Sequence, residues 1–218
     1  TLGGTGSLLN DGTLAGFGTV AGTGGFTNSS VLVQSGGNLV LSNTGVNTNT
    51  GNWDLAPGAA LDLKGATLAN HGSIQLNSGT VSGTGTLVNA VGGTVFGRGG
   101  ITAPFSNAGA LVVDAGTTRV ERAFANSGQI QLTSNAATLA GGGVSNSGQI
   151  EGRGRVGNDV HNTGLLQALG GTLSFAGALA NTGSGVVAAG SGAKVLVLAG
   201  MARSEAQIQL DGGTFDNN

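Results

Sequence analysis

The chain has 218 residues, of which 45 are glycine, 39% are hydrophobic and only 8% are charged, and its formal net charge is −2. Glycine without a three-residue period excludes collagen, and the content of valine, leucine and isoleucine excludes a disordered charged tail. Cysteine is absent and the basic residues are scattered, which excludes disulfides, thiolate metal sites and a phosphate-binding surface.

An asparagine recurs along the chain at near-regular steps, and this internal repeat is the main feature of the sequence. The members are Asn10, Asn28, Asn70, Asn89, Asn107, Asn126, Asn146, Asn162 and Asn181. The steps are 16 to 20 residues long except for one of 42, which spans two units. We divide that gap at Asn43, because Leu41 and Gly45 reproduce the local motif there, and we interpret residues 46–51 as an inserted polar loop. Asn52 is the alternative point of division.

The sequence pattern of each repeat unit predicts three short strands. The first carries an apolar residue two positions before the asparagine, and this column is Leu8, Phe26, Leu41, Leu68, Leu87, Phe105, Phe124, Val144, Val160 and Leu179. A glycine usually follows the asparagine by two positions, and the second strand then brings Leu14, Ile74, Leu111, Ile130, Ile150 or Leu166. The third strand follows a Gly-Thr or similar turn, with Val81, Leu139, Leu173 and Phe215 as its apolar sites.

Apolar and polar residues alternate within these segments, as in 130–132 and 195–198, which is the pattern of β-strands. Helices are excluded, because glycine at this density would cost a helix about 1 kcal/mol per residue relative to alanine. Three strands that repeat every 18 or 19 residues predict an all-β fold, a parallel β-helix or β-solenoid. We expect about eleven turns in a single continuous solenoid over residues 1–218, which is a fragment or repeat region of a longer chain.

The asparagines have a structural role in this interpretation. Equivalent residues of successive turns stack in columns, so the apolar column forms the core and the asparagines form an amide ladder. We expect each asparagine to lie at a bend, where its tolerance of left-handed backbone geometry suits the corner, and the following glycine to relieve the turn.

A polar column lies five residues after the asparagine, at Gln75, Gln131, Glu151, Gln167 and, by alignment of Ser204 with the asparagines, Gln209. We expect it to face solvent as a polar ladder, with a ligand or partner face as the alternative. The best cluster of charges is Glu151, Arg153, Arg155, Asp159 and His161, which we expect to be solvated and to form exposed ion pairs. The candidate partner face is therefore Gln131, Glu151, Arg153, Arg155 and Gln167.

No pattern in the sequence indicates catalytic or cofactor chemistry. Polysaccharide-cleaving β-helices need clustered carboxylates on neighbouring turns, and the sequence also lacks a nucleophile elbow, a phosphate loop and the calcium-binding repeat of glycine and aspartate. We expect no catalytic residue, no cofactor, no metal site and no nucleic-acid partner. We also expect no membrane insertion by this segment, since it has no long apolar run.

The units NHGSIQL, NSGQIQL and NSGQIEG resemble the passenger repeats of bacterial autotransporters and of filamentous-hemagglutinin-like exoproteins. The resemblance covers nearly the whole chain. It implies right-handed winding of the solenoid, export across the outer membrane and a place on the bacterial cell surface or outside the cell. It also implies a role in adhesion, biofilm or cell-surface matrix.

We therefore expect a non-catalytic structural or adhesive rod of an exoprotein. Its expected partners are neighbouring solenoid segments, identical subunits placed end to end, and host-surface or matrix glycans. One alternative is a self-assembling subunit of an extracellular filament, formed by end-to-end stacking at open strand edges. The second alternative is a β-helix that binds or degrades polysaccharide.

Overall fold

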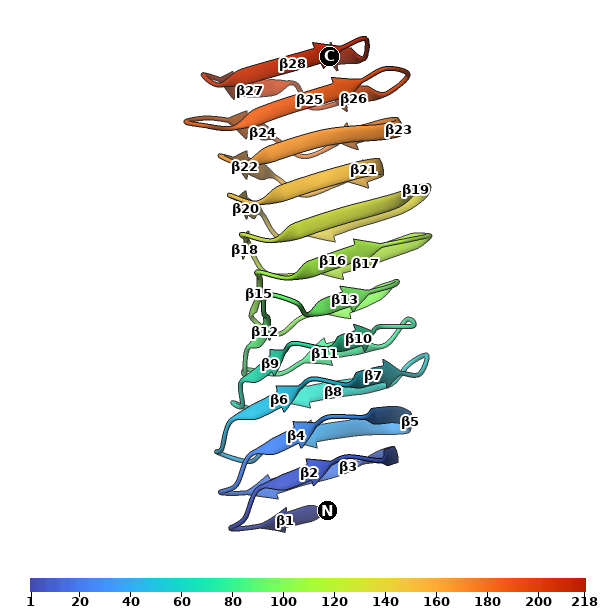
Figure 1. Ribbon diagram of the computed structural model, residues 1–218, viewed down its shortest axis with the longest axis vertical. Helices are drawn as coiled ribbons and strands as arrows, with labels where there is room; N and C mark the ends of the chain where they lie inside the picture. Colours follow the sequence, from blue (N-terminus) through green and yellow to red (C-terminus); the bar gives the residue numbers. More distant parts are fainter. The chain divides into compact units, whose positions relative to one another are not determined.

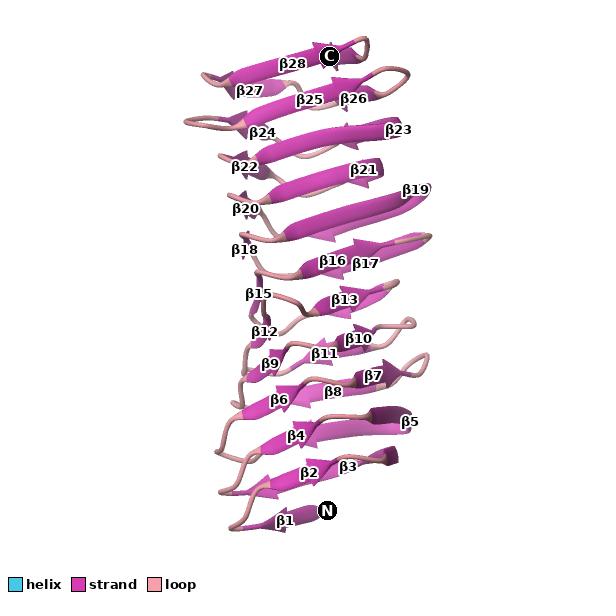
Figure 2. Cartoon of the chain, viewed as in Figure 1, coloured by secondary structure: helices cyan, strands magenta, loops and turns pink.

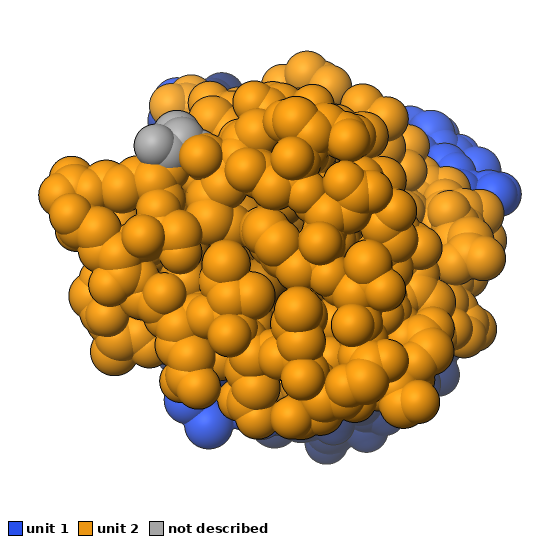
Figure 3. All heavy atoms as spheres, turned by 90° about the horizontal axis from the view of Figure 1, so that it is seen from above, with its two compact units in different colours: residues 1–110 blue, residues 111–218 orange. Residues whose placement is uncertain are grey.

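The structure is a computed structural model that describes residues 1–201 and 203–218. The described residues form strands and turns without a helix (Figure 2). They make two compact units, residues 1–110 and 111–218, which Figure 3 colours separately. Within each unit, strands pair in parallel with strands one turn further along the chain (Figure 1). The predicted parallel β-solenoid is confirmed, with about eleven turns of roughly 20 residues.

The strands of the first unit fall into two sheets. The narrow sheet holds β2 (Leu8–Asn10), β4 (Phe26–Asn28), β6 (Asn47–Asn49), β9 (Leu68–Asn70), β12 (Leu87–Asn89) and β15 (Phe105–Asn107). The wide sheet holds β1 (Leu2–Gly4), β3 (Thr13–Gly22), β5 (Val31–Leu41), β7 (Asn52–Leu55), β8 (Ala60–Leu63), β10 (Ser73–Gln75), β11 (Thr80–Ser82), β13 (Thr94–Phe96) and β14 (Gly99–Ile101).

The second unit repeats this plan. Its narrow strands are β18 (Phe124–Asn126), β20 (Val144–Asn146), β22 (Val160–Asn162), β24 (Leu179–Asn181) and β27 (Met201–Ser204). Its wide strands are β16 (Ala110–Val113), which begins at the boundary, β17 (Gly116–Val120), β19 (Gln129–Gly141), β21 (Gln149–Val156), β23 (Leu165–Phe175), β25 (Val186–Gly190), β26 (Lys194–Val197), β28 (Gln207–Asp211) and β29 (Thr214–Asn217). In β3, β5, β19, β21 and β23, the predicted second and third strands of a turn are continuous.

Apolar residues stack in register inside each unit. In the first unit, Leu32 pairs with Trp53 and Trp53 with Ile74, and all three are at most 1% exposed. In the second unit, Ile130 pairs with Ile150, which continues the same kind of buried column. Burial of these columns removes apolar surface from water at about 25 cal/mol per Å², which is the main stabilising contribution.

Division of the long gap at Asn43 is wrong. Asn49 pairs with Asn28 on one side and Asn70 on the other, so Asn49 is the ladder member, and neither Asn43 nor the alternative Asn52 takes that place. Leu41 is buried, but it belongs to β5 and pairs with Val20 and Leu63 in a different column.

The predicted polar loop at residues 46–51 is also wrong, because β6 lies inside it. Asn47 is fully buried and stands in the place of the apolar column, next to Leu68. Its Oδ1 accepts a hydrogen bond from the backbone N–H of Phe26 at 3.1 Å. Because an inward amide oxygen satisfies a backbone donor there, the position takes a polar residue and the hydrophobic pattern fails to find it.

The ladder asparagines do not have left-handed backbones. The non-glycine residues with positive φ in the described chain are Asn77 at 45° and Ser78 at 67°, whereas the ladder asparagines end extended strands. Among the glycines that follow the asparagines, Gly183 has a φ of 60° and relieves the turn as expected, whereas Gly148 has a different use. A Cβ on Gly148 would lie 2.1 Å from the carbonyl oxygen of Gly128 in the preceding turn. Glycine at position 148 therefore permits two turns to stack closely, although its own φ does not require glycine.

Candidate functional site

The asparagine ladder runs through the interior of both units. Each Nδ2 donates to the Oδ1 of the next asparagine, over distances of 2.6 to 2.8 Å and steps of 16 to 21 residues. The first unit links Asn10, Asn28, Asn49, Asn70, Asn89 and Asn107, and the second unit links Asn126, Asn146, Asn162 and Asn181.

Backbone carbonyls take up the remaining amide hydrogens of the ladder. Asn49 Nδ2, for example, also donates to the carbonyl oxygen of Ser73 at 3.0 Å. All of these asparagines are at most 1% exposed, apart from Asn10, which is half-buried. The ladder is therefore a structural element without a surface for a ligand. The predicted apolar column packs beside it: Leu8 is half-buried, and Phe26, Leu68, Leu87, Phe105, Phe124, Val144, Val160 and Leu179 are buried.

The structure brings three residues of the candidate partner face into one row. Gln131 on β19 pairs with Glu151 on β21, and Glu151 pairs with Gln167 on β23. The row continues through Ala188 to Gln209. Gln75, from the same predicted column, lies in the first unit on β10, between Asp54 and Phe96. The candidate face is therefore a feature of the second unit.

Glu151 is not a solvated charge, contrary to expectation. Its side chain is on the outer face of β21, yet the residue is only 8% exposed. Its Oε1 accepts hydrogen bonds from the Nε2 of Gln129 at 2.7 Å and of Gln131 at 3.4 Å, and its Oε2 accepts one from the Nε2 of Gln149. Charge-assisted hydrogen bonds of this kind stabilise a carboxylate that has lost most of its water.

Gln129 and Gln149 are functional candidates that the sequence reasoning missed. They pair with each other across β19 and β21, two residues before Gln131 and Glu151. Because alternate residues of a strand share a face, the Gln-x-Gln and Gln-x-Glu spelling in the two repeats was the signal that could have found them.

Arg153 and Arg155 are exposed; Arg153 lies at the bend of β21 and Arg155 lies beyond it. Arg153 Nη1 donates to the carbonyl oxygen of Gly170 at 3.3 Å. The aliphatic part of its side chain lies against Gly171, where a Cβ would be 3.2 Å from Arg153 Cδ. Neither arginine forms an ion pair within the described part of the chain, so the predicted ion pairs of this cluster are not formed.

The bend at Arg153 is shorter than the bends of the adjacent turns. Thr133 pairs with Arg153 and Thr138 with Arg155, so β19 advances five residues where β21 advances two. On the other side, Gly152 pairs with Ala168 and Gly154 with Leu173, and β23 again has the longer path. Figure 1 shows β21 ending short of β19 and β23 at this bend. Arg153 therefore lies at the short bend of β21, between the longer bends of β19 and β23.

The remaining charges of the predicted cluster are engaged locally. Asp159 Oδ1 accepts a hydrogen bond from the backbone N–H of Ala178 at 2.8 Å, and His161 Nε2 lies 3.1 Å from Thr182 Oγ1. Both residues border a groove of about 310 Å³ on the outer face of β20, β22 and β24.

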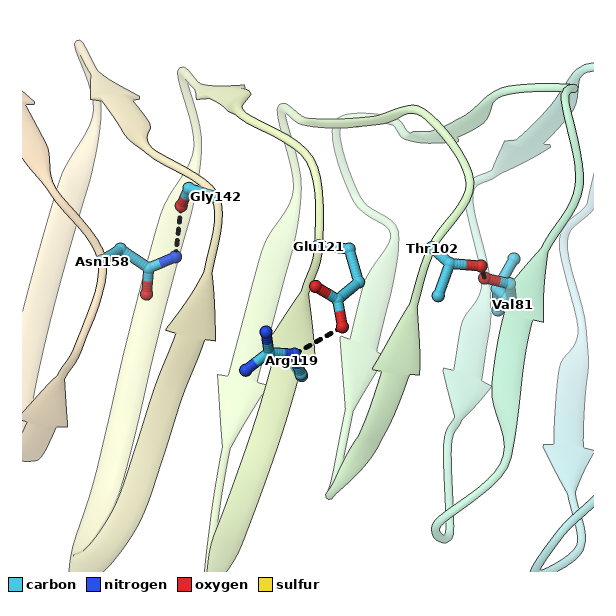
Figure 4. Close-up of polar contacts among 6 residues, drawn as sticks. All are labelled: Val81, Thr102, Arg119, Glu121, Gly142 and Asn158. Atoms are coloured by element: carbon cyan, nitrogen blue, oxygen red, sulfur yellow. Dashed lines mark hydrogen bonds and ion pairs between the residues drawn. The ribbon is translucent and has the colours of Figure 1, made fainter.

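Figure 4 shows two further polar contacts of the second unit. Arg119 and Glu121 point towards one another, and the hydrogen bond from the guanidinium lowers the pKa of the Glu121 carboxyl. In the second contact, Asn158 Nδ2 donates to the carbonyl oxygen of Gly142. The first contact lies within one turn and the second joins two neighbouring turns, and neither involves Gln131, Glu151 or Gln167.

Searches with known family models, curated proteins and solved structures found no match to this chain. Among residues 1–201 and 203–218, no three or more histidine, aspartate or glutamate side chains group in a way that could hold a metal ion. The same residues include no helix with the length and apolar character needed to cross a membrane.

Proposed function

We propose that the chain is a non-catalytic structural and adhesive module of an exported bacterial exoprotein, placed on the cell surface or outside the cell. The observation that carries the proposal is the buried asparagine ladder, which gives successive turns the same interior. Interior side chains serve to stack one turn on the next, and the outer faces are free to vary and to make contacts.

The outer face of the second unit supports the adhesive part of the proposal. Side chains of Gln131, Glu151 and Gln167 form a row across three strands, and the exposed Arg153 lies at the bend that follows Glu151 on β21. The solenoid backbone fixes the spacing of these groups, which reduces the ordering that a partner must impose on binding.

The proposal is tested by coating beads with the purified chain and measuring attachment, under flow, to mammalian cell monolayers and to bacterial biofilm matrix. Beads coated with the Phe124→Asp variant, which we expect to unfold locally, serve as the control. We expect the native chain alone to retain beads at the surface. Equal retention of both kinds of bead, or of neither, would contradict an adhesive function of the folded solenoid.

A second candidate function is end-to-end self-assembly into a filament. Ile208 and Leu210 on β28 continue the inward columns of Val187 and Ala189, yet they are 40% and 49% exposed. Figure 3 is viewed towards this end of the second unit. Parallel pairing of β28 with a further strand, such as one from another copy or from a further turn, would cover these side chains. Negative-stain electron microscopy over a range of concentrations tests this: fibres of constant width support assembly, and discrete particles at every concentration exclude it.

A further inference from the structure

A continuous polar surface covers one wall of the second unit. The wall is built by residues 129–132 of β19, 149–152 of β21 and 165–168 of β23, which all precede the bends of these strands. We define the amide face as the outward polar side chains of these segments, namely Gln129, Gln131, Gln149, Glu151 and Gln167. Neighbouring members are about 4.8 Å apart between strands and about 7 Å apart along a strand, so one ligand can contact several of them.

Glu151 sets the direction of the amide groups around it. Its carboxylate accepts hydrogen bonds from the Nε2 atoms of Gln129, Gln131 and Gln149. Since the nitrogen and the oxygen of an amide point in different directions, these contacts turn the Oε1 atoms of Gln131 and Gln149 away from Glu151. Gln167 pairs with Glu151 from the following turn, and its amide forms no hydrogen bond within the described part of the chain. The face therefore presents oriented acceptors and one free amide, which suit hydroxyl groups.

The charge of this wall favours a neutral ligand. Residues 129–132, 149–152 and 165–168 contain no lysine, arginine or histidine, and Glu151 is their only charged residue. The next cation along β21 is Arg153 at the bend, where its Nη1 donates to the carbonyl oxygen of Gly170. An anionic ligand would meet the charge of Glu151 without a cation on the wall to offset it. Hydroxyl groups donate to the amide and carboxylate oxygens and carry no charge.

An apolar platform adjoins the amide face on the same wall. Leu165 lies beside Gln149 on the following turn, and Val186 on β25 lies beside Leu165. Both side chains of the platform point outwards and are half-buried. A pyranose ring has C–H groups on its flat faces and hydroxyl groups at its rim. It can therefore cover Leu165 and Val186 while its hydroxyl groups contact the neighbouring amides.

We propose that the amide face and its apolar platform bind a neutral polysaccharide of extended, β-linked hexopyranose units, which lies across β19, β21, β23 and β25. Side chains of the wall repeat about every 4.8 Å from turn to turn, which is close to the length of one sugar unit in such a chain. An α-linked chain of the same sugars curls and loses this match. The inference rests on the adhesive function proposed above and names its ligand.

The test measures binding by isothermal titration calorimetry with cellopentaose, maltopentaose and tetragalacturonate. Maltopentaose has the same sugars as cellopentaose in a curled, α-linked chain, and tetragalacturonate adds negative charge. We expect cellopentaose to bind at least about tenfold more tightly than either of the others. Its affinity should change less than about twofold between low and high ionic strength, because the ligand is neutral. Equal binding of maltopentaose or tetragalacturonate, or no measurable binding of cellopentaose, would overturn the proposal.

Two double variants locate the site. Gln131→Ala with Gln167→Ala removes the amides on either side of Glu151 and should weaken cellopentaose binding about tenfold or more. The control is Asn52→Ala with Gln75→Ala, which removes two outward amides from β7 and β10 of the first unit. It should change the affinity less than about twofold, because these residues lie outside the amide face. Equal losses in the two double variants would overturn the placement of the ligand.

Two single variants test the separate parts of the site. Leu165→Ser removes the apolar contact for the sugar ring and should lower the affinity several-fold. Glu151→Gln removes the charge that orients the amides, so the side-chain amide resonances of Gln131 and Gln149 should shift in the ligand-free chain and the affinity should fall several-fold. Unchanged affinity in either variant would overturn the part assigned to that residue.

The bead assay separates this inference from the adhesive function on which it rests. Attachment of beads by a chain that does not bind cellopentaose overturns this inference alone. Binding of cellopentaose without attachment of beads overturns the adhesive function alone.

Discussion

The Nδ2 of Asn28 donates to the Oδ1 of Asn49 at 2.7 Å, from one turn of the solenoid to the next. The two residues are 21 positions apart, and both are fully buried. Because a buried amide left unpaired is costly, this contact sets which residue of one turn lies over which residue of the next. The repeat therefore fixes register by hydrogen bonding and the core by apolar packing.

Asn49→Ala should destabilise the chain by about 1–3 kcal/mol, because Asn28 Nδ2 loses its acceptor and Asn70 Oδ1 loses its donor. Asn52→Ala is the matched control, since Asn52 is exposed and its Oδ1 accepts a hydrogen bond from Ser73 Oγ. Urea unfolding followed by circular dichroism measures both. A larger loss for Asn52 than for Asn49 would contradict the register at β6.

Asn47→Leu should also be destabilising, although it restores an apolar residue to the column. The substitution leaves the backbone N–H of Phe26, the Nδ2 of Asn43 and the carbonyl of Thr67 without their contacts to this side chain. The expected cost is about 1–3 kcal/mol for each buried group that stays unpaired. Chemical denaturation checks this, and a more stable leucine variant would show that packing outweighs polar satisfaction here.

Phe124→Asp places a charge in the apolar column of the second unit, where the phenylalanine is 4% exposed. An uncompensated buried charge should cost about 3 kcal/mol or more. Ala125→Asp is the control, because Ala125 is the next residue of β18 and its side chain is exposed on the outer face. Thermal unfolding should separate the two variants clearly. Equal midpoints would show that this column does not form the core.

Gly148→Ala should be strongly destabilising, because the new methyl group would lie 2.1 Å from the carbonyl oxygen of Gly128 and force the two turns apart. Gly12 occupies the equivalent place in the first unit, and a Cβ there would meet nothing within 4 Å. Gly12→Ala should therefore leave stability nearly unchanged. Differential scanning calorimetry compares the pair, and a loss of similar size in both would contradict the close approach.

The periodicity of the asparagines and apolar residues was enough to predict the solenoid. Each turn stacks on the next only if it places an apolar side chain and an asparagine at the same positions. Phe124 and Asn126 are in the predicted places for this reason. Asn47 escaped prediction because its amide oxygen replaces an apolar group to satisfy the backbone of Phe26. A sequence pattern shows which residues are polar but not which hydrogen-bond donor a polar atom contacts. The apolar Leu41 was therefore assigned to the column in place of Asn47, although it belongs to a different column.

The candidate face was predicted less completely than the fold. Alternation placed Glu151, Arg153 and Arg155 on one side of a strand, and all three do point outwards. β21 turns between Gly152 and Gly154, however, so Glu151 and Arg155 lie on different walls of the solenoid. Two of the three partners of Glu151 come from the preceding turn, and Gln129 is 22 residues away, so its contact depends on the register between turns. The short bend at Arg153 was readable in the sequence, since Asn146 and Asn162 are only 16 residues apart.

The central claim is that a buried amide ladder holds the turns in register and leaves the outer faces to make contacts. Hydrogen exchange of asparagine side-chain amides, followed by nuclear magnetic resonance, tests it most directly. We predict slow exchange for the Nδ2 groups of Asn49, Asn70, Asn146 and Asn162, and fast exchange for that of the exposed Asn52. Fast exchange of all five groups in the folded chain would contradict the ladder and the account built on it.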